Sequence, residues 1–156
     1  MTRISESTGE PFDTRLGAYC LVERDGKFLL ALWDMRHRDP NFQPRWTLPG
    51  GGIDLGEDLR AGVRREVQEE TGYLVDSLRL LDAQTGVIAG RYRYAEVDHA
   101  MQTVAIVYTG RVVGGELTHE QQGSTSRAAW FTREEIAQLP RVERVDRALA
   151  LYDGAA

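Results

Sequence analysis

Two neighbouring segments, 16–23 and 27–33, carry apolar residues at both odd and even positions. A strand that is apolar on both of its faces is typical of a sheet that is covered on each side. Between the two segments stands Asp25-Gly26, a pair that favours the tight turn of a β-hairpin. The pattern therefore predicts two antiparallel strands of a sheet that is buried on both faces.

The remaining pattern mixes strands and helices without regular βαβ alternation. Further strands are predicted over 46–48, 74–81, 101–113 and 127–131, and helices over 58–70, from Thr132 and after Pro140. Gly72 stands where a helix commonly ends in a left-handed residue. Thr132 and Glu135 have the spacing of a capping box, which opens a helix. This order favours an α+β fold or a sheet sandwiched by helices.

The chain is long enough for one domain. Residues 1–13 are polar and contain Gly9 and Pro11, so we interpret them as a flexible leader. Residues 14–154 contain no internal repeat and no long linker, and 156 residues can bury a full core. We therefore expect a single domain over 14–154, with a long polar loop at 34–45.

Composition and charge exclude several classes of protein. The 19 basic and 24 acidic residues give a net charge of −5, which argues against a stable nucleic-acid partner. One cysteine, Cys20, excludes a disulfide framework and fits a reducing compartment, and its apolar neighbours predict a buried, inert thiol. The sequence has no apolar run long enough for a membrane span and no apolar secretory signal near Met1. We expect a cytoplasmic protein with no membrane partner, and a homodimer remains open.

The segment 58–70 places three carboxylates on one helix face. At about 100° per residue, Glu66, Glu69 and Glu70 fall within an arc of about 100°, and Gly62 lies on the same face. An adjoining stripe of apolar residues can pack against the sheet: Leu59, Val63 and Val67. Taken alone, such an acidic face is most often simply solvated.

A bound divalent cation would stabilise these three carboxylates. Like charges at this spacing repel one another, and a hard cation removes that cost. Oxygen ligands without nearby His or Cys point to Mg²⁺, or to Mn²⁺ as a substitute. The turn Gly50-Gly51-Gly52 allows close backbone approach, and a free carbonyl there could add a ligand.

The joint spacing of these residues resembles the Nudix box. The order is Gly51, five residues, Glu57, seven residues, Arg65-Glu66-Val67, one residue, Glu69-Glu70, one residue and Gly72, preceded by Leu48-Pro49-Gly50. The flanking pattern extends the resemblance over most of residues 15–152. Tyr73 departs from it, since the family usually has an aliphatic residue there.

The resemblance implies an α/β/α sandwich with a mixed sheet between helices, and hydrolysis of a nucleoside diphosphate linked to another group, with Mg²⁺ or Mn²⁺. The metal ligands that it implies are the side chains of Glu66, Glu69 and Glu70 and the carbonyl group of Gly50. Glu69 matches a position that binds metal or helps to deprotonate water. Arg65 and Glu57 match positions that orient the helix and its glutamates, so they complete the expected catalytic group.

The expected partner is a small nucleotide-like diphosphate substrate. The residues that we expect to contact it are Arg36, Arg38, Arg45, Trp46 and Arg93, with Arg91, Tyr92 and Tyr94 as further candidates. The alternative is that the arginines are solubilising loop charges and the tryptophans are core, which we prefer for Trp33. A further acidic residue could come from Glu120, whereas Glu116 fits a solvated loop charge. The histidines, His37, His99 and His119, are dispersed and fit surface positions.

Two function classes follow from these residues. The first is a metal-dependent pyrophosphohydrolase that acts on a nucleotide-like diphosphate. The second is a non-catalytic Nudix-like sensor that binds a nucleotide. Because the box keeps every acidic position, catalysis is favoured. The substrate, the phosphorus atom attacked, the number of metal ions and the general base (Glu69, Glu66 or Glu120) stay open.

Overall fold

A computed structural model of the chain describes residues 2–90, 93, 98–118 and 125–154. Of the residues singled out in the sequence, Arg91, Tyr92, Tyr94, His119 and Glu120 lie outside these ranges. The elements are β1 (Arg3–Ile4), β2 (Pro11–Arg24), β3 (Lys27–Trp33), β4 (Arg45–Thr47), β5 (Gly50–Gly52), α1 (Leu59–Thr71), β6 (Tyr73–Ile88), β7 (Ala100–Gly115), β8 (Thr125–Phe131), α2 (Arg133–Ile136) and α3 (Glu143–Gly154). No helix in the described ranges is long and apolar enough to cross a membrane.

The strands form a mixed sheet in the order β4-β3-β2-β7-β6, with β1 and β5 also paired to β2 and with β8 paired to β3. β2 runs parallel to β7, and its pairings with β1, β3 and β5 are antiparallel. The predicted hairpin between β2 and β3 is confirmed, since Arg24 pairs with Lys27 across the turn. Asp25 and Gly26 both adopt positive φ, at 53° and 77°, as the two central residues of such a turn require.

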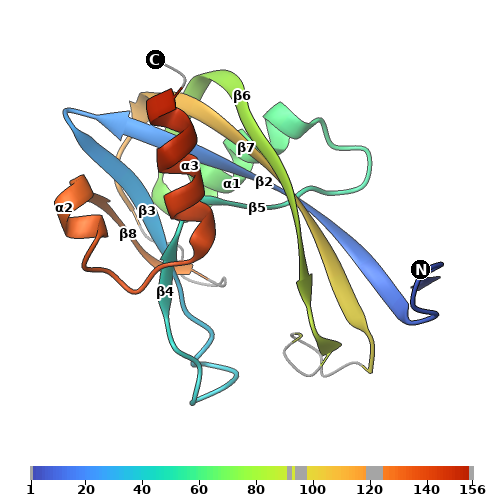
Figure 1. Cartoon of the computed structure of the whole chain (residues 1–156). Coiled ribbons are helices and arrows are strands. Elements are labelled where there is room, and N and C mark those ends of the chain that lie inside the picture. Colours follow the sequence, from blue (N-terminus) through green and yellow to red (C-terminus); the bar gives the residue numbers. More distant parts are fainter. Residues whose placement is uncertain (1, 91–92, 94–97, 119–124, 155–156) are drawn as a thin grey trace.

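Helices cover both faces of the sheet, which confirms the predicted sandwich. In β2, Tyr19 and Leu21 join a core with Val145 and Leu149 of α3. The intervening residues of β2 face the other core, where Val63 and Val67 of α1 lie. Figure 1 shows α3 in front of the sheet and α1 behind it. Alternating side chains of one strand thus serve two cores.

Helix boundaries follow the signals in the sequence. Gly72 ends α1 with φ 82°, and its N–H donates to the carbonyl oxygen of Gln68. Thr132 and Glu135 form the predicted capping box at the start of α2. Cys20 is buried, and burial raises the pKa of its thiol to about 12, so the inert thiol predicted there agrees with its surroundings.

The strands β6 and β7 are longer than predicted. Each has 16 residues, and together with the first half of β2 they continue beyond the helices as an arm (Figure 1). The predicted ranges followed the apolar runs, whereas hairpin pairing such as Ile88 with Met101 uses backbone groups that any residue carries.

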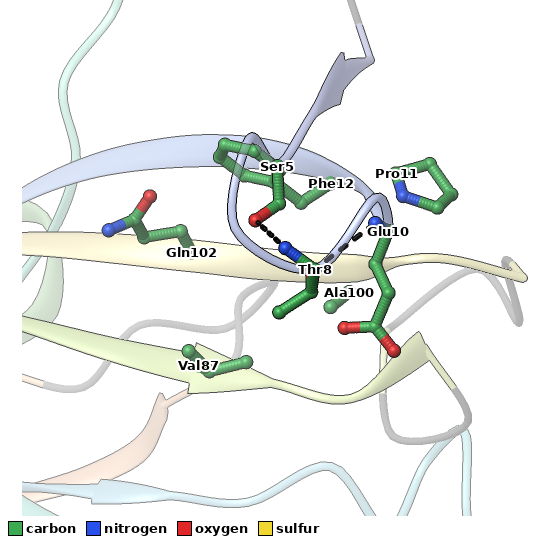
Figure 2. A pocket seen from close by; sticks show the side chains of 8 residues that line it. All are labelled: Ser5, Thr8, Glu10, Pro11, Phe12, Val87, Ala100 and Gln102. Carbon is green, nitrogen blue, oxygen red and sulfur yellow. Dashed lines mark hydrogen bonds between the residues drawn. The ribbon is translucent and has the colours of Figure 1, made fainter.

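The first residues take part in this arm. Within the segment predicted as a flexible leader, Arg3–Ile4 forms β1, and β2 already begins at Pro11. The turn between them is held by side chains, because Thr8 donates its backbone N–H to Ser5 Oγ at 3.3 Å and Glu10 donates its own to Thr8 Oγ1 at 3.3 Å. A hollow of about 260 Å³ lies between this turn and residues of β6 and β7, including Val87. Figure 2 shows the side chains that line it.

Candidate active site

Helix α1 carries the predicted carboxylates to the glycine turn of β5. The Asp58 side chain caps the helix by accepting a hydrogen bond from the N–H of Ala61 at 3.1 Å. Val63 and Val67 are fully buried, as the apolar stripe predicts, so their burial fixes the rotation of the helix. Gly62 has no room for a side chain, because a Cβ atom there would lie 2.5 Å from Ile53 Cδ1 and 2.9 Å from Glu57 Oε1. The missing side chain lets the loop before α1 pack against it.

Glu66 and Glu70 both reach this turn. Glu70 is buried, with 6% of its surface exposed, and its Oε2 accepts a hydrogen bond from the N–H of Gly50 at 3.0 Å. The Glu66 carboxylate lies against Gly51, where a Cβ atom would come within 2.5 Å of Oε2. Two of the predicted metal ligands therefore meet at adjacent glycines, from one face of one helix.

Arg65 connects the remaining acidic residues. Its Nε and Nη2 donate to the Glu57 carboxylate at 2.7 and 2.9 Å. Its Nη1 donates to Glu66 at 3.1 Å and to Glu69 at 3.2 Å, and Nη2 also donates to the carbonyl oxygen of Gly52 at 3.1 Å. One guanidinium thus ties the loop, the turn and two helix carboxylates together.

This network corrects the expectation that the three helix carboxylates simply repel one another. Arg65 neutralises part of the charge of Glu66 and Glu69, so the repulsion is smaller than the spacing suggests. The hydrogen bonds from Arg65 lower the pKa of Glu57 to about 2. The Glu57 contribution to folding is therefore present above its ordinary pKa of 4.5 and is lost only as pH falls toward 2.

Exposure distinguishes the helix carboxylates from one another. The side chain of Glu69 is 47% exposed, against 15% for Glu66, and Glu70 is buried. Glu69 is therefore the helix carboxylate with the widest access to water, although it too accepts a hydrogen bond from Arg65.

The donor set fits a hard divalent cation in its chemistry. Glu66 and Glu70 offer carboxylate oxygens beside a glycine backbone that lacks side chains, and oxygen ligands of this kind suit Mg²⁺ and Mn²⁺. Within residues 2–90, 93, 98–118 and 125–154, no three acidic, His or Cys side chains already converge as a metal-binding cluster. The guanidinium group of Arg65 forms ion pairs with both Glu57 and Glu66.

The predicted substrate contacts are not gathered at this turn. Trp46 corrects the prediction, because it is buried and packs edge-on against Phe131 with ring centroids 4.7 Å apart. It presents no free ring face on which a base could stack. Arg36 forms a 2.7 Å ion pair with Asp34, and Arg38 is exposed.

Trp33 also differs from the prediction. It is only half-buried and belongs to neither core, because β3 leaves the covered part of the sheet at its end. Its ring packs against Phe42 with centroids 4.9 Å apart, and the Arg45 guanidinium lies 5.4 Å from its centroid. The 34–45 loop is therefore anchored through Trp33.

Arg93 belongs to a separate ion-pair cluster on the arm. Its Nη1 lies 3.0 Å from Asp13 Oδ2, and His99 Nε2 lies 2.7 Å from the same oxygen. His99 is thus half-buried and paired, contrary to the plain surface position expected from sequence. These bonds lower the pKa of Asp13 to about 2, and hydrogen bonding to Asp13 raises the pKa of His99.

Sequence reasoning missed the residues behind the glycine turn. Tyr19 pairs with Gly50 in the sheet, and Gly17 pairs with Gly52. Arg15 Nη2 lies 3.3 Å from the place that a Cβ atom on Gly52 would take. The alternation of β2 puts Arg15 and Tyr19 on one face, but their link to the turn requires the pairing of β2 with β5.

Sequence comparisons place the chain among known proteins. The sequence matches the NUDIX domain family over residues 13–152. It is 33% identical to a MutT-like protein of Streptomyces ambofaciens over 99% of this chain and 87% of that protein. It is 30% identical to an ADP-ribose pyrophosphatase of Methanocaldococcus jannaschii over 78% of this chain and 62% of that protein.

The fold agrees as well. A NUDIX hydrolase from Nitrosomonas europaea superposes with a TM-score of 0.73 at 22% identity, covering 92% of this chain and 90% of that structure. The family match spans nearly the whole described sheet and the helix that carries the carboxylates. The chain therefore belongs to the Nudix hydrolase family and is a MutT-like pyrophosphohydrolase.

Proposed function

We propose that this chain cleaves a diphosphate bond in a nucleoside-diphosphate-linked or nucleoside triphosphate substrate, with a divalent metal ion. The observation that carries this proposal is the convergence of Glu66 and Glu70 on the Gly50-Gly51 turn. A buried carboxylate beside a glycine backbone suits the binding of a cation and of the phosphates that accompany it. An acidic protein also needs such a cation to bring a polyanion to a glutamate-rich face.

We assign the metal to Glu66, Glu70 and the Gly50 carbonyl group, with Glu69 as a further ligand or as the base. When bound, Mg²⁺ or Mn²⁺ would neutralise phosphate oxygens and lower the pKa of a coordinated water. Phosphoryl transfer leaves the protein mainly the tasks of positioning and electrostatic stabilisation.

Glu69 and Arg65 have different proposed roles in the site. Glu69 has the widest access to water, so it is the residue best placed to accept a proton from the attacking water. Arg65 is a positioning residue, because its bonds to Glu57 and to the Gly52 carbonyl hold the turn against the helix. We expect the rate to rise from neutral to alkaline pH, since the attacking water must lose a proton.

The similarity to an ADP-ribose pyrophosphatase supports a substrate in which a nucleoside diphosphate is joined to a second group. The 34–45 loop is a candidate for contacting that second group through Arg36, Arg38 and Arg45. If those arginines bind substrate, replacing each with Ala raises KM far more than it lowers kcat.

The test is a hydrolysis assay on nucleoside triphosphates, nucleotide sugars, dinucleoside polyphosphates and ADP-ribose, with Mg²⁺ and with Mn²⁺. We expect hydrolysis of at least one substrate, and its loss in excess EDTA. Glu66→Gln should remove this activity while leaving the melting temperature of the metal-free protein nearly unchanged. Full activity in EDTA, or no hydrolysis across the panel, would contradict the proposal.

A further inference from the structure

Arg144, near the start of α3, has an unusual environment. Its Nε is the one buried side-chain nitrogen or oxygen in the described ranges that lacks a hydrogen-bond partner. Its guanidinium carbon lies 3.9 Å from the centroid of the Tyr19 ring. A buried polar group without a partner is costly, and a cation near a helix N-terminus is further disfavoured by the helix dipole.

Arg15 contacts the same tyrosine. Its Nη1 donates to Tyr19 Oη at 3.5 Å, and its Nη2 lies beside Gly52. Within the described ranges, neither Arg15 nor Arg144 forms an ion pair with a carboxylate, unlike Arg147 on the same helix as Arg144. Two guanidinium groups that lack a carboxylate partner among the described residues therefore contact one aromatic side chain.

Tyr19 links these cations to the catalytic carboxylates. Tyr19 pairs with Gly50 in the sheet, and a Cβ atom on Gly50 would lie 2.8 Å from Tyr19 Cδ1. The N–H of Gly50 donates to Glu70 on the side of α1. The cationic pair and the acidic helix face thus flank the same three-residue turn.

We propose that Arg15 and Arg144 bind a phosphate of the substrate that lies beyond the diphosphate bond being cleaved. An anion there supplies an acceptor for the buried Nε of Arg144 and a counter-charge for both guanidinium groups. The pair thereby selects substrates with three or more phosphates, such as nucleoside triphosphates, over a nucleoside diphosphate joined to a neutral sugar. This selection rests on the proposed function, whereas the binding of an anion does not.

The first experiment measures anion binding without catalysis. Inorganic triphosphate is titrated calorimetrically, in EDTA, into the wild-type protein and the variants Arg15→Gln, Arg144→Gln and Arg147→Gln. Arg147 is the matched control, because it lies on the same helix and pairs with Asp82 at 2.6 Å. We expect both test variants to bind at least about tenfold more weakly, the loss of one charge-assisted hydrogen bond, and Arg147→Gln to bind as wild type. Equal binding by all four proteins, or none by the wild type, overturns the proposal.

The second experiment compares a nucleoside triphosphate with ADP-ribose in steady-state kinetics. In Arg15→Gln and Arg144→Gln, KM for the triphosphate should rise at least about tenfold, with kcat within about threefold and with KM for ADP-ribose unchanged. A purely structural role would lower kcat for both substrates together with the melting temperature, which overturns the assignment. Arg15 is exposed, so its variant folds even if Arg144→Gln does not.

The two experiments separate the two proposals. If the wild type hydrolyses neither substrate but binds inorganic triphosphate through Arg15 and Arg144, the proposed function fails and the anion site stands. If hydrolysis proceeds and both variants keep the wild-type KM for the triphosphate, the anion site is not part of the substrate site and the selection is refuted.

Discussion

A single methyl group at Gly51 tests whether activity depends on the position of the Glu66 carboxylate. In Gly51→Ala, the new Cβ atom would lie 2.5 Å from Glu66 Oε2, where ordinary contact begins at 3.4 Å. The carboxylate must therefore retreat by about 0.9 Å, the difference between the two distances. A misplacement of about 1 Å at a catalytic centre costs about a hundredfold in rate, so we expect kcat to fall by about that factor.

The same substitution should leave the fold nearly intact. The atom that must move is the end of a flexible side chain, and Gly51 has no positive φ. We expect a loss below about 1 kcal/mol, which lowers the melting temperature of a domain of this size by less than about 4 °C.

Gly50→Ala is the matched control. Its φ is 149°, and a Cβ atom there would overlap the carbonyl oxygen of Ala18 and come within 2.6 Å of Tyr19 Cα. Backbone strain and a backbone displacement each cost about 1–3 kcal/mol, so the melting temperature should fall by at least about 4 °C. Thermal melts and initial hydrolysis rates of both variants make the comparison. Near-normal kcat in Gly51→Ala, or equal destabilisation by both substitutions, would refute the reasoning.

Three further predictions concern the metal, the base and the ion pairs. Mg²⁺ at about one hundred times its Kd should stabilise the wild type by about 2.7 kcal/mol, which raises its melting temperature by roughly 5–11 °C. Glu70→Gln keeps an acceptor for the Gly50 N–H, so its metal-free melt should match wild type while the Mg²⁺ shift shrinks; an unchanged shift would remove Glu70 from the metal site. Glu69→Gln should lower kcat at least about a hundredfold, and near-normal turnover would transfer the role of base to another residue. Because the pKa of His99 is raised by Asp13, its contribution to stability is present below pH 6.5 and is lost as pH rises through its folded pKa. The melting temperatures of wild type and His99→Gln, measured between pH 5 and pH 9, should therefore converge at high pH. A difference in melting temperature that stays constant with pH would exclude the His99–Asp13 ion pair as its cause.

The sequence alone determined the helix that carries the carboxylates. Its start, its left-handed end at Gly72 and its buried stripe at Val63 and Val67 depend on residues within about four positions of one another, which is the range of helical contacts. The hairpin at Asp25-Gly26 is equally local. The apolar pattern of β2 and β3 predicted a sheet covered on both faces, and helices cover both in the structure.

Only the tertiary structure decided which side chains surround the turn. Trp46 is buried because β4 pairs with β3 beside Phe131, which no local pattern indicates. Tyr19 reaches both Gly50 and Arg144 because sheet pairing and helix packing join residues that are 31 and 125 positions away. Such contacts depend on the register of distant segments. The spacing of the box therefore predicts the carboxylate face, whereas the cations that flank it follow from the fold.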